Sequence, residues 1–153
     1  MNMKVYEGFF FEASGNWQQG LEGSGHIMTT SFESPIGAPV SMGGKGVGTN
    51  PEDLMVAAAA SCQLLTLAAI MQFNKIPFNN ITITSRGAFR FTKAGPELTR
   101  IEHCPEIWLN QEEYDRSAAT IKKFFSLAEK SCLVSKAIQN NVEVVVKGCI
   151  QYE

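Results

Sequence analysis

The sequence predicts an α+β fold built as a single domain over residues 1–153. Strand-like segments rich in Phe, Ile and Val lie at both ends and in the middle of the chain, and two long helical segments lie between them. With 153 residues, 44% of them hydrophobic and 18% charged, the chain can enclose a full apolar core without cross-links.

The first 34 residues place aromatic and branched side chains among glycines and polar residues, as in short strands joined by turns. We predict an antiparallel meander with turns at Ser14-Gly15 and Glu22-Gly23. Residues 35–48 contain two prolines and five glycines with little periodicity, so they are interpreted as a loop.

A long helix is predicted from Pro51 to about Phe73. Thr49 or Asn50 can cap it, proline suits its first position, and two acidic residues follow in the first turn. Residues 54–73 carry no charge, which raises a membrane span as an alternative. Four polar residues interrupt the segment and no basic residues flank it, so we expect no membrane contact and a buried or dimer-forming helix instead.

After this helix, a long hairpin is predicted to turn at Ala94-Gly95-Pro96. A second helix begins near Asn110 and carries apolar residues at helical spacing. Ser131 is expected to cap a short third helix from Cys132 to about Gln139. One final strand is predicted from Val142 to Tyr152.

Charge and missing motifs exclude several classes of function. A formal charge of −2 with scattered lysines and arginines gives no patch for nucleic acid. The glycines of residues 43–48 match no nucleotide-binding motif. His26 and His103 lie in unrelated segments without metal-ligand spacing, and His103 beside Cys104 is interpreted as a surface histidine. A zinc-stabilised structural module remains one possible function of this chain.

The chain contains four cysteines and no C-x-x-C motif. The first twelve residues do not resemble a signal peptide, so we expect a cytoplasmic protein with reduced thiols. Cys62 lies in the apolar helix and Cys132 lies 70 residues later, near the start of a short helix. Cys62 and Cys132, called the cysteine pair below, are interpreted either as redox-active or as two small buried hydrophobes. Cys104 and Cys149 are interpreted as structural.

The stretch G-T-N-P-E-D-L, an alanine-rich segment ending in A-S-C, and the later A-E-K-S-C-L-V-S together resemble the OsmC/Ohr family of hydroperoxide reductases. The order of predicted elements agrees over essentially the whole chain. The resemblance implies an intertwined homodimer, with antiparallel sheets wrapped around central helices and active sites at the subunit interface.

Carried over by position, the resemblance makes Cys62 the peroxide-attacking cysteine, Cys132 the resolving cysteine and Glu52 the glutamate that orients an arginine. This chain departs from the family pattern because no arginine precedes Arg86 and because Leu133 stands where many members have proline. A substitute cation is then needed, and the candidates are Lys45, Arg86, Arg90 and Arg100. Glu52 can also be an ordinary first-turn carboxylate.

The implied function is the reduction of organic or fatty-acid hydroperoxides to alcohols, as part of an oxidative stress response. The reaction passes through a sulfenic acid on Cys62 and a Cys62–Cys132 disulfide, which an external dithiol reduces. No metal or other cofactor is required. The alternative is an OsmC-like dimer with little peroxidase activity that binds an apolar ligand or has another thiol-based role.

Overall fold

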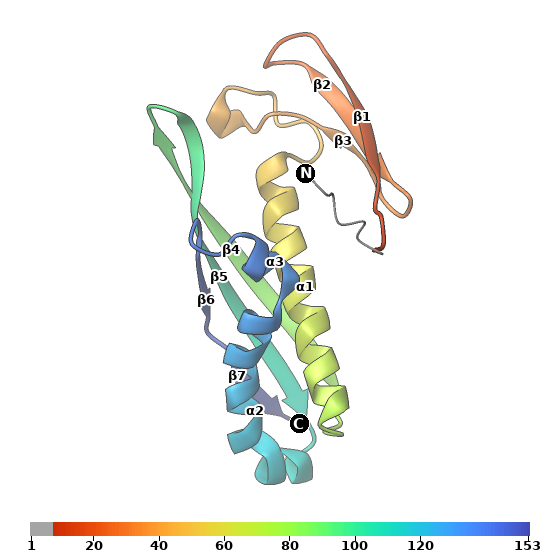
Figure 1. Cartoon of the computed structure of the whole chain (residues 1–153), viewed down its shortest axis with the longest axis vertical. Coiled ribbons are helices and arrows are strands. Elements are labelled where there is room, and N and C mark those ends of the chain that lie inside the picture. Colours follow the sequence, from red (N-terminus) through yellow and green to blue (C-terminus); the bar gives the residue numbers. More distant parts are fainter. Residues whose placement is uncertain (1–7) are drawn as a thin grey trace, which may run out of the picture. The chain divides into compact units, whose positions relative to one another are not determined.

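The computed structural model describes residues 8–153. The chain divides into two compact units, one ending at Asp53 and one spanning Leu54–Glu153, and each is described by itself. Figure 1 shows the elements of both units. The α+β class predicted from the sequence is confirmed.

The N-terminal unit contains an antiparallel sheet in the order β1 (Ala13–Gln18), β2 (Ser24–Thr29), β3 (Glu33–Ile36). The predicted meander is therefore confirmed, and a short 3-10 helix, η1 (Val40–Met42), follows it. The turn predicted at Ser14-Gly15 is wrong, because both residues pair with β2 inside the sheet. A Cβ on Gly15 would lie 2.6 Å from a β2 carbonyl oxygen, so glycine permits close strand contact there.

Helix α1 (Pro51–Phe73) has the bounds that the sequence predicted. Asn50 Oδ1 accepts a hydrogen bond from the Asp53 N–H at 2.8 Å, which identifies the capping residue. Within α1, the buried residues are Ala59, Gln63, Leu67 and Met71, one every four positions. By length and composition α1 could cross a membrane, but a core helix of a soluble protein has the same properties, so this is weak support for a membrane span.

The C-terminal unit contains a mixed sheet. Its long strands β4 (Asn80–Thr92) and β5 (Gly95–Leu109) are antiparallel, as the predicted hairpin requires. The single final strand was predicted incorrectly. It is divided into β6 (Glu143–Val146) and β7 (Cys149–Tyr152), and both run parallel to β5, so this sheet is not wholly antiparallel.

Gly148 gives the physical reason for that division. A Cβ built there would lie 2.3 Å from the Phe125 ring of helix α2, so the backbone passes directly over an aromatic side chain. Only glycine permits that approach, and the chain leaves the strand to make it.

Helix α2 (Gln111–Ser131) begins after Asn110, whose side chain accepts a hydrogen bond from the Glu113 N–H, as predicted. Helix α3 (Leu133–Ala137) is shorter than predicted. Ser131 does not cap it, because that residue is still the last of α2, and Cys132 occupies the N-cap position without a side-chain hydrogen bond to the amides of α3 that a cap would bind. Cys132 is therefore the junction between two helices.

One face of β5 supports the core. Alternate residues of this strand are buried, and two of them pack with Leu67 and Met71 of α1 and with four apolar residues of α2. Figure 1 shows α1 and α2 running alongside β4 and β5 in this unit. A second apolar cluster joins Ala59 of α1 to Ile101 of β5 and to Val142. The two clusters hold α1 against the sheet.

Candidate active site

The structure brings the cysteine pair together. Cys62 lies on α1 and is partly exposed, whereas Cys132 lies between α2 and α3 and is 0% exposed. The two thiols interact directly, and a hydrogen bond between them affects the pKa of each. Both cysteines carry free thiols. Cys62 is therefore the more exposed residue of the pair.

The surroundings of Cys62 favour its thiolate. Burial raises its pKa, but hydrogen bonds from the Cys132 thiol and from the backbone N–H groups of Val134 and Leu133 outweigh burial, so the pKa is lowered. Thr66 makes the smallest contribution to this lowering. Its hydroxyl donates to the Cys62 carbonyl oxygen at 2.8 Å. These hydrogen bonds offer anion stabilisation from neutral donors.

The surroundings of Cys132 have the opposite effect. Burial and the neighbouring Cys62 raise the pKa of Cys132, against a smaller lowering by Ser135. Position on a helix alone favours Cys132 as the thiolate, because it is the cysteine at a helix start. The two pKa shifts have the opposite order, since the first amides of α3 lower the pKa of Cys62 whereas the pKa of Cys132 is raised.

Glu52 lies in the first turn of α1, in the part of the helix that belongs to the N-terminal unit. Its side chain is half-buried, and one carboxylate oxygen, Oε2, is buried without a hydrogen-bond partner in the described part of the chain. The N-terminal unit contains no arginine that could pair with it. Glu52 is therefore a candidate site residue without the partner that the family resemblance assigns to it.

The candidate cations on the sheet are directed away from α1 or engaged elsewhere. Gly87 faces Val56 of α1, so the alternating positions Arg86 and Arg90 of β4 lie on the opposite face of the sheet. Arg90 pairs with Glu97 at 3.0 Å. Arg100 pairs with Glu102 and with Glu143, each at 3.3 Å. Lys45 belongs to the N-terminal unit.

The histidines and remaining cysteines do not form a metal site. His26 of β2 pairs with Glu33 of β3 at 3.2 Å. The prediction that His103 lies on the surface is wrong, because it is 0% exposed on the inner face of β5. Cys104 and Cys149 lie on β5 and β7, away from the cysteine pair. Among residues 8–153, no group of three or more His, Cys, Asp or Glu side chains has metal-binding geometry.

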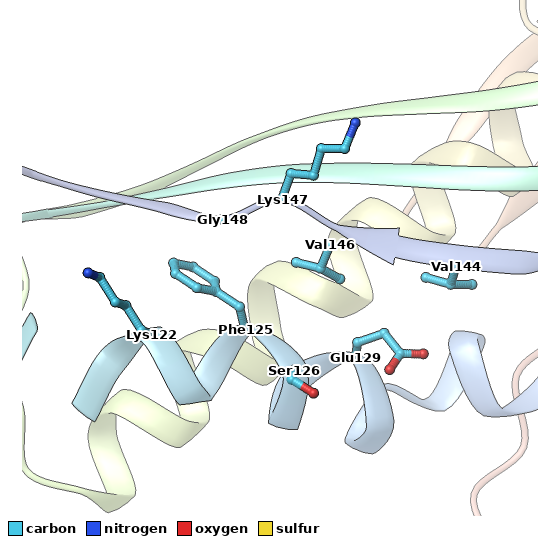
Figure 2. Close-up of a pocket in the computed structure, with 8 residues that line it drawn as sticks. All are labelled: Lys122, Phe125, Ser126, Glu129, Val144, Val146, Lys147 and Gly148. Atoms are coloured by element: carbon cyan, nitrogen blue, oxygen red, sulfur yellow. The ribbon is translucent and has the colours of Figure 1, made fainter. Parts of the chain in front are cut away.

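A surface pocket lies elsewhere on the C-terminal unit, between α2 and the segment that joins β6 to β7. Figure 2 shows Phe125 and Val146 facing each other across it, with Lys147 directed to the far side of the strand. Lys147 forms an ion pair with Glu102 there, at 2.7 Å. Neither member of the cysteine pair lines the pocket, so it is not the predicted site.

Sequence reasoning missed three contributors to this site. Thr66 follows Cys62 by four residues, so helical periodicity could have placed both on one face of α1. The amides of Leu133 and Val134 gave no such signal, because their contact with Cys62 depends on how α3 is placed against α1.

The family model described as OsmC-like protein matches residues 43–147. The chain is 31% identical over 141 residues to the uncharacterized protein YmaD of Bacillus subtilis (strain 168), covering 92% of this chain and 94% of that protein. It is 30% identical over 125 residues to an organic hydroperoxide resistance protein-like protein of Staphylococcus aureus (strain MSSA476), covering 78% and 83% of the two chains.

Solved structures agree with this assignment. The organic hydroperoxide resistance protein OsmC of Legionella pneumophila superposes with a TM-score of 0.68 at 25% identity, over 97% of this chain and 99% of that chain. An OsmC-like protein of unknown function from Vibrio cholerae gives a TM-score of 0.76 at 15% identity, over 92% and 99%, and supports the fold alone. The chain belongs to the OsmC/Ohr family, which is associated with organic hydroperoxide resistance.

Proposed function

We propose that this protein reduces organic hydroperoxides to alcohols with Cys62 as nucleophile and Cys132 as resolving thiol. One observation carries the proposal: a partly exposed thiol with a lowered pKa lies against a fully buried thiol with a raised pKa. An oxidant in solvent meets the more nucleophilic member of the pair first. The second thiol is already in place to react with the product.

The chemistry balances with these two thiols and an external reductant. The Cys62 thiolate attacks one peroxide oxygen, the O–O bond breaks, and the departing alkoxide takes a proton to become an alcohol. Cys62 is left as a sulfenic acid. The Cys132 sulfur then attacks the Cys62 sulfur, and the hydroxyl group leaves as water with the thiol proton. An external dithiol reduces the resulting disulfide by exchange.

Neutral donors take the place of the missing arginine in this proposal. The amides of Leu133 and Val134 hydrogen-bond to Cys62 and lower its pKa. Proline at position 133 could not supply the first of these amides. The two departures of this chain from the family pattern therefore compensate each other. We retain Glu52 as a candidate catalytic residue, because its half-buried carboxylate has one oxygen without a hydrogen-bond partner among the described residues.

The substrate class follows from the side chains around the thiol. Leu65, one turn after Cys62 on α1, and Leu133, next to Cys132, are each 72% exposed. Covering such side chains with an alkyl group contributes free energy that hydrogen peroxide cannot recover. This favours organic or fatty-acid hydroperoxides as substrates.

We further propose that residues 1–153 act as one OsmC-like domain in a homodimer. Only four of the 23 residues of α1 are buried in the single chain, while Met55, Leu65 and Phe73 are 43%, 72% and 83% exposed. An apolar helix of this kind is stable in water when a second copy covers it. Sedimentation should show a dimer at micromolar concentration that Phe73→Glu weakens. A stable wild-type monomer would contradict this.

Single-turnover chemistry tests the two roles. Cys62→Ser should abolish the consumption of cumene hydroperoxide, whereas Cys132→Ser should reduce one equivalent and stop as a sulfenic acid that dimedone traps on Cys62. Cys104→Ser serves as the matched control and should retain full turnover. Dimedone trapping on Cys132 in the Cys62→Ser variant would reverse the roles.

The alternative is an OsmC-like dimer that binds an apolar ligand and has little peroxidase activity. The missing arginine and the unpartnered Glu52 oxygen favour it. Slow oxidation of Cys62 by both cumene hydroperoxide and hydrogen peroxide in a stopped-flow experiment would select this alternative.

A further inference from the structure

Two polar side chains are enclosed in the apolar interior of the C-terminal unit. Gln63 of α1 and His103 of β5 are both 0% exposed. His103 Nδ1 lies 2.6 Å from the Ser85 hydroxyl oxygen of β4. His103 Nε2 and both polar atoms of the Gln63 amide have no hydrogen-bond partner within the described residues. Buried amide and imidazole atoms are almost always hydrogen-bonded in folded proteins, so a bonding group meets these three atoms.

The position of Gln63 on α1 is defined by its neighbours on the same helical face. Ala59, one turn earlier, belongs to the apolar cluster that contains Ile101 of β5. Leu67, one turn later, belongs to the cluster that contains Ile107 of β5. Gln63 therefore lies between the two clusters on the side of α1 that faces β5.

The position of His103 is defined in the same way on the strand. The buried residues of β5 alternate along one face, and His103 lies on that face between Ile101 and Ile107. Each of these isoleucines packs in a cluster with α1. The buried positions of β5 between these isoleucines are His103 and Pro105, and His103 is the one with a polar side chain that can face Gln63 across the gap between the two apolar clusters.

The three unpartnered atoms determine what can fill the gap. Neither bulk solvent nor a second subunit reaches side chains that the chain itself encloses completely. A direct bond between Gln63 and His103 Nε2 leaves one amide atom without a partner, because a neutral imidazole nitrogen either donates or accepts. A water molecule can donate and accept at once, and three polar partners are the usual number for a buried water.

We propose that Gln63 and His103 form a buried water-binding site between α1 and β5, and that this site positions Cys62 against Cys132. Gln63 is the one polar residue on the buried face of α1, and the other members of that face are Ala59, Leu67 and Met71. Apolar contacts alone permit a helix to slide or rotate, whereas a hydrogen-bonded anchor defines one position. Cys62 directly precedes Gln63 in the chain, so the hydrogen bonds of Gln63 to the water define the direction of the Cys62 thiol. Gln63 is a positioning residue for the thiol chemistry proposed above.

The wild-type protein gives the first test, which needs no variant to fold. A crystal structure at high resolution should show one water within hydrogen-bonding distance of Gln63 and of His103 Nε2. Electron density that shows the two side chains bonded to different groups, or no shared water between them, overturns the proposal.

A double-mutant cycle gives the second test. Gln63→Met and His103→Phe should each lower the midpoint of thermal unfolding. The double variant should lower the midpoint by less than the two single changes added together, because each single variant leaves the other polar side chain buried without a partner and the double variant does not. Additive losses mean that the two side chains do not share a site, and they overturn the proposal.

The positioning role is tested by the reactivity of Cys62, with the exposed Gln72 of the same helix as the matched control. Gln63→Met should slow alkylation of Cys62 by iodoacetamide several-fold and move its rate profile to higher pH, while Gln72→Met should change neither. Equal reactivity in both variants overturns the positioning role. Because alkylation needs no peroxide, this result is independent of whether the proposed peroxidase activity exists.

Discussion

Replacing Leu133 with proline should remove one backbone donor from Cys62 and leave the fold intact. Leu133 is the first residue of α3, and its side chain is 72% exposed. Proline lacks the N–H group but is well accepted at the first position of a helix. The preceding residue, Cys132, has φ −61° and ψ 126°, an extended conformation that a following proline favours.

The size of the effect follows from the lost hydrogen bond. A hydrogen bond to a charged group contributes about 1.5–3 kcal/mol. Cys62 is partly exposed and keeps the Val134 amide and the Cys132 thiol as donors, so the lower end of that range applies. A loss of about 1.5 kcal/mol corresponds to a roughly tenfold lower ratio of thiolate to thiol. The pKa of Cys62 should therefore rise.

Alkylation by iodoacetamide, followed at the Cys62 peptide by mass spectrometry from about pH 5 to 9, measures this change because only the thiolate reacts. Leu133→Ala is the matched control, since it removes the side chain and keeps the N–H group. At pH values below the pKa of Cys62, the proline variant should react about tenfold more slowly than the alanine variant. Equal rates in the two variants would refute the role of this amide.

Three further outcomes are expected. Oxidised protein should contain one disulfide within a single chain, between the cysteine pair, and peptide mapping checks this. Gly148→Ala should lower the free energy of unfolding by about 1–3 kcal/mol or more, because the new Cβ meets the Phe125 ring, whereas Gly20→Ala meets no atom within 4 Å and should have little effect in urea titrations. Burial lowers the pKa of His103, so the unfolded chain binds a proton that the native protein does not, and the free energy of unfolding should fall as pH drops below about 6.5. His103→Gln should reduce the dependence of the free energy of unfolding on pH below about 6.5, and His26→Gln should not. The opposite result would contradict the assignment of this pH dependence to His103.

The sequence alone determined the elements whose signals are local. Asn50 and Pro51 placed the start of α1, and Asn110 placed the start of α2, because a cap acts on amides within one turn of itself. The cysteine pair was also identified from the sequence, through the two motifs that flank it. The family assignment covers both motifs, since the matching family model spans residues 43–147.

Burial of His103 was predictable in principle. It alternates with Ile101 and Ile107 along β5, and period-two spacing places all three on one face of the sheet. The division of the last strand was not predictable, because it depends on Gly148 meeting the ring of Phe125, 23 residues away in the sequence.

Only the tertiary structure decided how hydrogen-bond donors and burial are distributed between the two thiols. From the sequence, the family resemblance made Cys62 the attacking cysteine, whereas helix position alone favoured Cys132 as the thiolate, since a helix end acts on the residues nearest to it in the chain. In the folded chain the amides that follow Cys132 bond instead to Cys62, about 70 residues away, and burial suppresses ionisation of Cys132 itself. The pKa of a thiol depends on donors and on exposure in three dimensions, and neither quantity is encoded by the residues next to it.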